Sequence, residues 1–132
     1  MLGKVCAGSV VAFLAIMSLP NPADAVTAKD FELMTTQDLY DVCSVKTEEK
    51  LARDAVYFCT GFFSGAIAYH DSITGPDSKR IVCAPEGTTR NDAVLAFIDW
   101  AKANNTNNEL MNAKPLSGAI RAAQAKWPCV KK

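Results

Sequence analysis

Cysteines carry the strongest chemical signal in this chain. Five are present, and one of them, Cys6, lies near the start of an apolar N-terminal segment with the pattern of an export signal. Four remain once that segment is removed: Cys43, Cys59, Cys83 and Cys129. An even number in an exported chain indicates two disulfides, because the compartment outside the cytoplasm is oxidising. No two lie in the C-x-x-C spacing typical of zinc sites, so we expect no metal and no other cofactor.

Other residue types give little sign of catalysis. His70 is the only histidine, and with the mature cysteines oxidised no thiolate nucleophile is left. Ser64 lies near two glycines, but outside the G-x-S-x-G spacing and within an expected helix. A P-loop, a dinucleotide fingerprint and an H-E-x-x-H motif are all absent from the sequence. We therefore expect a protein that is not an enzyme.

The first 25 residues have the three parts of a secretory signal peptide. A short basic start is followed by the apolar run 5–19, by Pro20-Asn21-Pro22 and by the small-residue site Ala23-Asp24-Ala25. A run of this length is short for a membrane span, which needs about 20 apolar residues. We expect cleavage after Ala25, export to the periplasm and a single mature domain of residues 26–132 that does not contact the membrane.

Charge excludes one class of partner. The chain has 14 basic and 14 acidic side chains, and cleavage would remove one of each, Lys4 and Asp24. No basic patch with interleaved aromatic residues is present, so we expect no binding to nucleic acid.

Hydrophobic spacing predicts helices and no strands. Each expected helix has a start signal, namely Thr36, Thr47, Thr89 with Asp92 three residues later, or Pro115. Residues 26–36 should form a loose lead-in, and residues 109–113 a single turn. The fold class is therefore all-α, a small four-helix bundle crosslinked by two disulfides, with helices over residues 36–43, 47–72, 89–103 and 115–127.

The stretch from Val56 to His70 is apolar on two opposite sides, which is typical of a helix buried on both. We expect it to be the central helix, with Gly61, Phe62 and Gly65 as packing residues where a neighbouring helix approaches closely. One of its faces could instead meet a second copy of the chain, giving a homodimer.

Antiparallel neighbouring helices favour one pairing of the cysteines. A hairpin of the last two helices brings Cys83 near Cys129, which leaves Cys43 to pair with Cys59 and to hold the first helix against the central one. The spacing alone permits the two other connectivities as well.

The ordered cysteine pattern resembles a known family. Its elements are Leu39-Tyr40-x-x-Cys43, Cys59-x-Gly61-Phe62-x-x-Gly65, Cys83-x-Pro85 and Trp127-Pro128-Cys129. They resemble the Rap/Tai family of type VI secretion immunity proteins, which are small, exported and α-helical. The resemblance implies periplasmic binding and neutralisation of a protein toxin; some members block peptidoglycan amidases, and dimeric members are known. Asn104-Asn105-Thr106 departs from the His-Pro expected after the third helix, so a particular toxin is not implied.

An immunity protein would act by placing a loop in the active-site cleft of its toxin. Residues 71–80 are the longest irregular piece and contain the turn signal Gly75-Pro76-Asp77. The candidate contacts are Asp71, Ser72, Thr74, Asp77, Lys79 and Arg80. The alternative is that this loop only connects two helices.

Two other functions fit the same composition. One is a periplasmic acid-stress chaperone of the HdeA type, in which protonation of the carboxylates would loosen the chain and expose apolar helix faces. The other is an envelope protein of the same fold that has no toxin.

Overall fold

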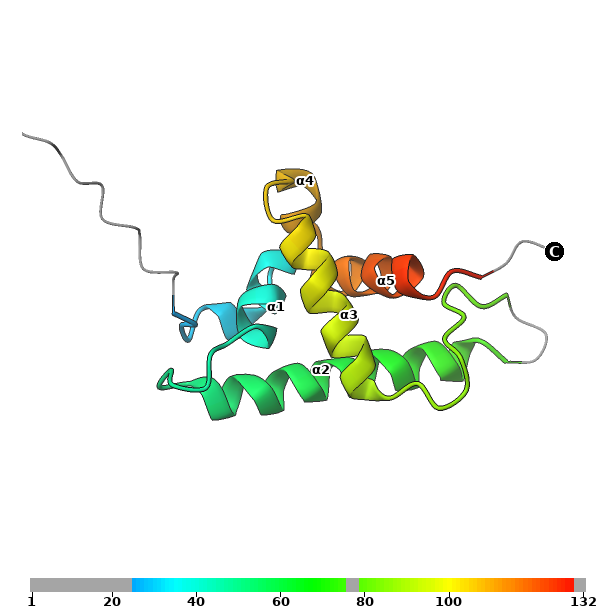
Figure 1. Ribbon diagram of the computed structural model, residues 1–132, viewed down its shortest axis with the longest axis horizontal. Helices are drawn as coiled ribbons and strands as arrows, with labels where there is room; N and C mark the ends of the chain where they lie inside the picture. The colour runs from blue at the N-terminus through cyan, green and yellow to red at the C-terminus, as the bar shows by residue number, and fades with distance from the viewer. Residues whose placement is uncertain (1–24, 76–78, 130–132) are drawn as a thin grey trace, which may run out of the picture.

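Helices make up all the regular structure in residues 25–75 and 79–129, the part of the chain that the computed structural model describes (Figure 1). The fold is all-α, as the sequence predicts, with four longer helices and a single turn where residues 109–113 were expected to form one. The elements are the 3-10 helix η1 (Asp30–Glu32) and the α-helices α1 (Thr36–Cys43), α2 (Ala52–Ile73), α3 (Arg90–Ala103), α4 (Asn108–Met111) and α5 (Pro115–Lys126).

Start signals set the beginning of three helices. Thr89 and Asp92 form a reciprocal capping box at α3, and Pro115 occupies the first turn of α5, as predicted. At α1 the N-cap is Thr35, not Thr36. The reason is that the Thr36 hydroxyl is buried and donates instead to the backbone carbonyls of residues 113 and 114, at 3.0 and 3.2 Å.

The second helix begins at Ala52 and not at Thr47, so the predicted start is wrong. The carboxylate of Glu49 accepts hydrogen bonds from the backbone N–H of Val26 at 2.9 Å and of Lys46 at 3.1 Å. This side chain therefore closes a turn before the helix and fixes the lead-in. Val26 is only 8% exposed and belongs to the core, so the lead-in is not loose.

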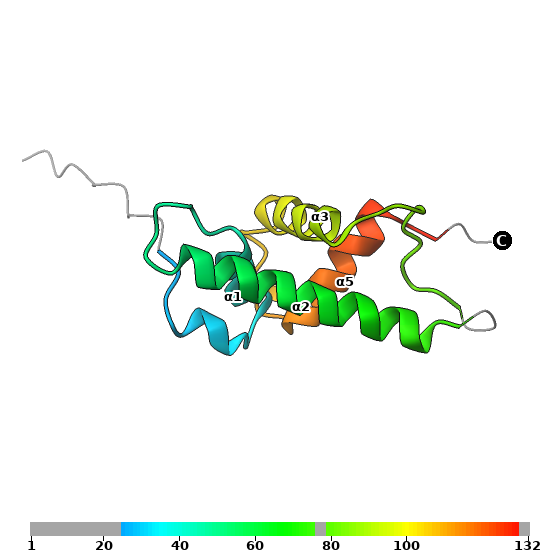
Figure 2. The ribbon, with the colours of Figure 1, turned by 90° about the horizontal axis from the view of Figure 1, so that it is seen from below.

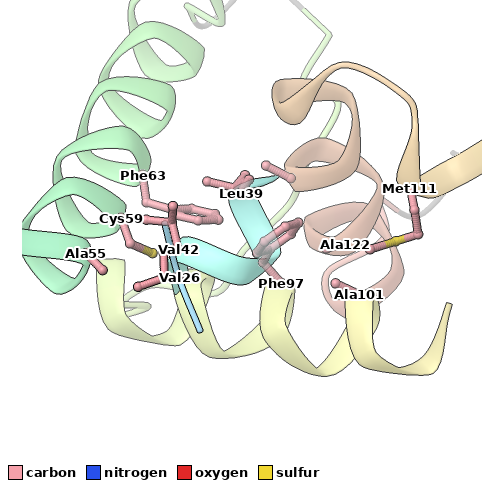
Figure 3. Packing of buried hydrophobic residues seen from close by; sticks show 11 residues of the cluster. Val26, Leu39, Val42, Ala55, Cys59, Phe63, Phe97, Ala101, Met111 and Ala122 are labelled. Carbon is pink, nitrogen blue, oxygen red and sulfur yellow. The ribbon is translucent and has the colours of Figure 1, made fainter. Parts of the chain in front are cut away.

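The hub of the fold is the short helix α1, although the sequence favours α2. Helix α1 packs against η1, α2, α3, α4 and α5. Leu39 and Val42 on α1 and Phe97 on α3 are fully buried, and Figure 3 shows them between the side chains of the surrounding helices. Helix α2 lies along one side of the molecule and buries a single stripe (Figure 2).

Both predicted disulfides are present. Cys43 is bonded to Cys59 and Cys83 to Cys129, with Cα–Cα distances of 5.2 and 4.9 Å. The first joins the end of α1 to α2. The second joins the segment after α2 to the end of α5, where the backbone N–H of Cys83 also donates to the carbonyl of Trp127 at 3.1 Å.

The expected signal peptide, apart from Ala25, lies outside the described residues. Among the helices of the described part, none has the length and apolar character needed to cross a bilayer.

Candidate functional site

The candidate loop begins later than the sequence predicts, because α2 continues through Ile73. Asp71 and Ser72 lie in the last turn of the helix, and the Ser72 hydroxyl donates to the carbonyl of Tyr69 at 2.8 Å. Thr74 caps the helix with both its backbone N–H, at 3.0 Å, and its hydroxyl, at 2.6 Å, donating to the carbonyl of His70. Asp77 lies outside the described residues. The helix end therefore orders the first half of the candidate site.

An ion pair joins the two ends of the loop. The Arg80 guanidinium donates from Nη2 to Asp71 Oδ1 at 2.9 Å, and His70 Nδ1 lies 3.3 Å from the same oxygen. The hydrogen bond with His70 and the pairing with Arg80 lower the pKa of Asp71 below its ordinary value. Both partners of the ion pair are about half exposed, at 56% for Asp71 and 49% for Arg80, so the pair fixes geometry more than it adds stability. Lys79, next to it, is exposed.

An apolar groove lies beside this loop, and we call it the trough. It is bounded by the C-terminal half of α2, by the segment 80–89 and by α5, and its volume is about 360 Å³. Phe63 and Ala119 form its buried floor. Its lining also includes large apolar side chains that are each more than a third exposed: Ile67, Tyr69, Ile73, Ile81 and Leu116.

The trough also contains the only histidine. His70 lies among the lining residues, and its Nε2 atom is buried without a hydrogen-bond partner in the described part of the chain. No local sequence pattern indicates this groove, which forms only when α2 and α5 are brought together from distant parts of the chain.

Two of the three expected packing residues on α2 do not pack against another helix. A Cβ added at Gly61 or Gly65 would meet no atom within 4 Å, because both glycines lie on the side of α2 opposite the buried stripe. The prediction of a close internal approach at these glycines is wrong. Phe62 is half-buried and does pack against the core, with its ring edge-on to Phe63 at 5.5 Å.

The close approach in this fold is instead at Gly118 on α5. A Cβ there would lie 2.6 Å from Oγ1 and 3.0 Å from Cβ of the buried Thr36 on α1. Glycine within a helix is unfavourable by about 1 kcal/mol relative to alanine, so its position inside a helical pattern was the available sequence signal.

The remaining polar groups of the described residues bear on metal binding and on the role of Ser64. In the described part of the chain, no group of three or more His, Cys, Asp or Glu side chains could hold a metal ion. The Ser64 hydroxyl donates to the carbonyl of Thr60 at 2.8 Å and accepts from Arg90 Nη1 at 2.8 Å. Ser64 is therefore a link between α2 and α3.

Comparison with known proteins identifies a family. A sequence model of the family described as Rap1a immunity proteins matches residues 35–129, from the N-cap of α1 to Cys129. The match contains both disulfides, the candidate loop and the whole trough. No curated protein and no solved structure matches the chain significantly.

Proposed function

The chain belongs to the family of Rap1a immunity proteins, and on that premise we propose that it binds and neutralises a toxin delivered by a type VI secretion system. A protein of this kind protects the cell that makes it, and its action is non-enzymatic: it occupies a surface that the toxin needs. The observation that carries the proposal is the family match over all five α-helices, together with the two disulfides that make the fold rigid.

The rigid end of α2 supports inhibition by occlusion. A preorganised loop loses little conformational entropy on binding, so more of its contact energy appears as affinity. The Asp71–Arg80 pair and the Thr74 cap order the end of α2 and hold Arg80 against it. We assign contacts with the toxin to Asp71, Ser72, Asp77, Lys79 and Arg80, and a supporting role to Thr74, which is 9% exposed. A peptidoglycan amidase is the toxin class that we propose.

Export to the periplasm fits the disulfide chemistry, because disulfides persist in oxidising compartments. We propose that the signal peptide is removed after Ala25. Mass spectrometry of the protein from a periplasmic fraction would then give a chain that begins at Val26, whereas an uncleaved chain from the cytoplasm would contradict this part of the proposal.

A homodimer is a further part of this proposal. The outer side of α2 has open space at Gly61 and Gly65, and Tyr57 on the same helix is 72% exposed. Light scattering during size-exclusion chromatography would give twice the mass of the mature chain if two copies associate, and a concentration-independent monomer mass if they do not.

A charge reversal tests whether the loop 71–80, and not another part of the surface, contacts the toxin. Lys79→Glu should abolish protection against the toxin, taken as the product of the adjacent open reading frame. Lys50→Glu is the matched control, because Lys50 is also exposed and lies just before the opposite end of α2. Equal protection by the two variants would remove Lys79 from the interface, and equal loss would indicate a general effect of charge.

A further inference from the structure

The residue directly after the proposed cleavage site is part of the core. Val26 is only 8% exposed and belongs to the core cluster drawn in Figure 3. Ala25, the residue before it, is exposed. The chain therefore passes from exposed to buried at the bond that the signal peptidase would cut. Residues 26–34 lie outside the part of the chain that matches the family, so the match assigns them no role.

The backbone nitrogen of Val26 lies against a carboxylate. Its N–H donates to Glu49 Oε2 at 2.9 Å, in a partly buried environment. The other oxygen, Oε1, accepts from the backbone N–H of Lys46 at 3.1 Å, so the carboxylate is held from two sides. The next amide along the chain, that of Thr27, donates to a different carboxylate, Asp30 Oδ2, at 2.6 Å. The nitrogen of Val26 therefore has a fixed acidic partner of its own.

Cleavage changes the chemistry of this nitrogen. A signal peptidase would hydrolyse the bond between the carbonyl carbon of Ala25 and the nitrogen of Val26. Water supplies a hydroxyl to the carbonyl carbon, which becomes the carboxylic acid of the released peptide, and a proton to the nitrogen, which becomes a primary amine. At neutral pH the acid ionises and the amine takes up one more proton, because an α-amino group is mostly protonated there. The amide N–H is thus replaced by an ammonium group with three N–H donors.

We propose that cleavage after Ala25 converts this hydrogen bond into an internal ion pair, between the α-ammonium group of Val26 and the carboxylate of Glu49, which stabilises the mature fold. The proposal rests on the cleavage site proposed above and not on the identity of the toxin. Charge-assisted hydrogen bonds are roughly twice as strong as neutral ones, and partial burial limits their screening by salt. Glu49 lies within the loop closed by the Cys43–Cys59 disulfide, so the pair ties the start of the mature chain to that crosslinked loop.

The ion pair would exist only in the processed protein. In the uncut chain the nitrogen of Val26 is a neutral amide, which keeps the hydrogen bond to Glu49 but lacks the ammonium charge. The uncut chain in the cytoplasm would also lack both disulfides, because that compartment keeps thiols reduced. The fold would therefore reach its full stability only after export and cleavage.

A double-mutant cycle tests the ion pair. Two chains with both disulfides formed are compared, one beginning at Val26 and the other at Ala25, which moves the ammonium group one residue away, by about 3.8 Å. Each chain is also made with Glu49→Gln, which keeps an acceptor oxygen but removes the charge. Urea denaturation should show that retaining Ala25 lowers the equilibrium constant for folding at least about fivefold when Glu49 is present. The same extension should change it less than about twofold in the Glu49→Gln background.

A neighbouring glutamate and a chemical probe make the test specific. Glu48→Gln is the matched control, because Glu48 is exposed and accepts instead from the hydroxyl of Thr47 at 3.2 Å; it should leave the effect of Ala25 unchanged. Acylation of the α-amine near neutral pH, followed by mass spectrometry, measures the amine directly. The paired amine of Val26 should react at least about tenfold more slowly than that of a chain beginning at Ala25, because it must first leave Glu49. Glu49→Gln should reduce this protection.

Three results would overturn the proposal. They are an equal effect of Ala25 with and without Glu49→Gln, equal acylation rates in the two chains, and a periplasmic protein that does not begin at Val26. Protection of cells against the toxin is measured separately. A failed cycle in a protein that still protects would refute the ion pair alone, and a successful cycle in a protein that does not protect would leave the ion pair standing and remove the immunity function.

Discussion

The contact between α1 and α5 gives the sharpest prediction of stability, through Gly118→Ala. The added methyl group would lie 2.6 Å from Oγ1 of Thr36, much closer than van der Waals contact allows. Thr36 cannot simply turn away, because its hydroxyl donates to two carbonyls at 3.0 and 3.2 Å and its backbone N–H donates to the carbonyl of Ala113 at 2.8 Å. The two helices must therefore separate or these hydrogen bonds must break.

The expected loss combines one favourable effect with two unfavourable ones. Alanine favours the helix over glycine by about 1 kcal/mol. Overpacking costs about 1–3 kcal/mol, and a buried hydroxyl deprived of its partners costs a further 1–3 kcal/mol or so. The three terms together give a net loss of about 1–5 kcal/mol in the free energy of unfolding, and a loss near 3 kcal/mol would lower Tm by roughly 12–15 °C for a domain of this size.

The same substitution on α2 is the control. Gly61→Ala and Gly65→Ala meet open space and should each raise the free energy of unfolding by about 0.5–1 kcal/mol. Urea denaturation with intact disulfides gives all three values. In a double-mutant cycle, Thr36→Ala should couple to Gly118→Ala by more than about 1 kcal/mol, because the two residues are in contact. A Gly118→Ala variant as stable as Gly61→Ala would refute the account of this contact.

Three further predictions concern the crosslinks and the caps. Removing the Cys83–Cys129 bridge, which closes a loop of 46 residues, should lower the free energy of unfolding by about 4 kcal/mol. Removing the Cys43–Cys59 bridge, which closes 16 residues, should lower it by about 3 kcal/mol. Denaturation of the two double alanine variants measures both losses, and the opposite order would contradict the loop-entropy account. Thr89→Ala should lower the free energy of unfolding by about 1 kcal/mol, because it removes the cap on α3. Thr88→Ala is the control, because Thr88 is not part of that cap. The hydrogen bonds from Thr89 lower the pKa of Asp92 below the ordinary 3.8, so its contribution is complete above that pH and is lost as pH falls through the lower, folded-state pKa. Urea denaturation at a series of pH values should therefore show stability that falls below about pH 4 and falls less in Asp92→Asn. Opening of the fold and ANS binding under milder acid would favour the acid-chaperone alternative.

Sequence signals that span only a few residues predicted the helices. Capping residues, Pro115 and the helical spacing of apolar residues gave the helices, because caps and amphipathic faces are local features. The disulfide pairs followed from the expected helix hairpin and were confirmed. The start of α2 was missed, because the Glu49 carboxylate bonds to Val26, 23 residues earlier in the chain.

The role of α2 was misjudged for a physical reason. Apolar residues on two sides of a helix predict burial on both, but Tyr57 and Ile73 stay exposed, and the glycines face open space. Surface used for partners carries the same residue types as a core, so sequence alone does not separate the two. The trough and the Thr36–Gly118 contact depend on tertiary neighbours, and no local pattern gives them.

Protection of cells is the most direct test of the central claim. The product of the adjacent open reading frame would be exported to the periplasm of a host that lacks this chain, and viable cells would be counted with and without co-expression. The account predicts killing that the wild-type protein relieves and that Lys50→Glu still relieves. A neighbour that does no harm, or killing that this protein fails to relieve, would contradict the proposal that the chain neutralises that toxin.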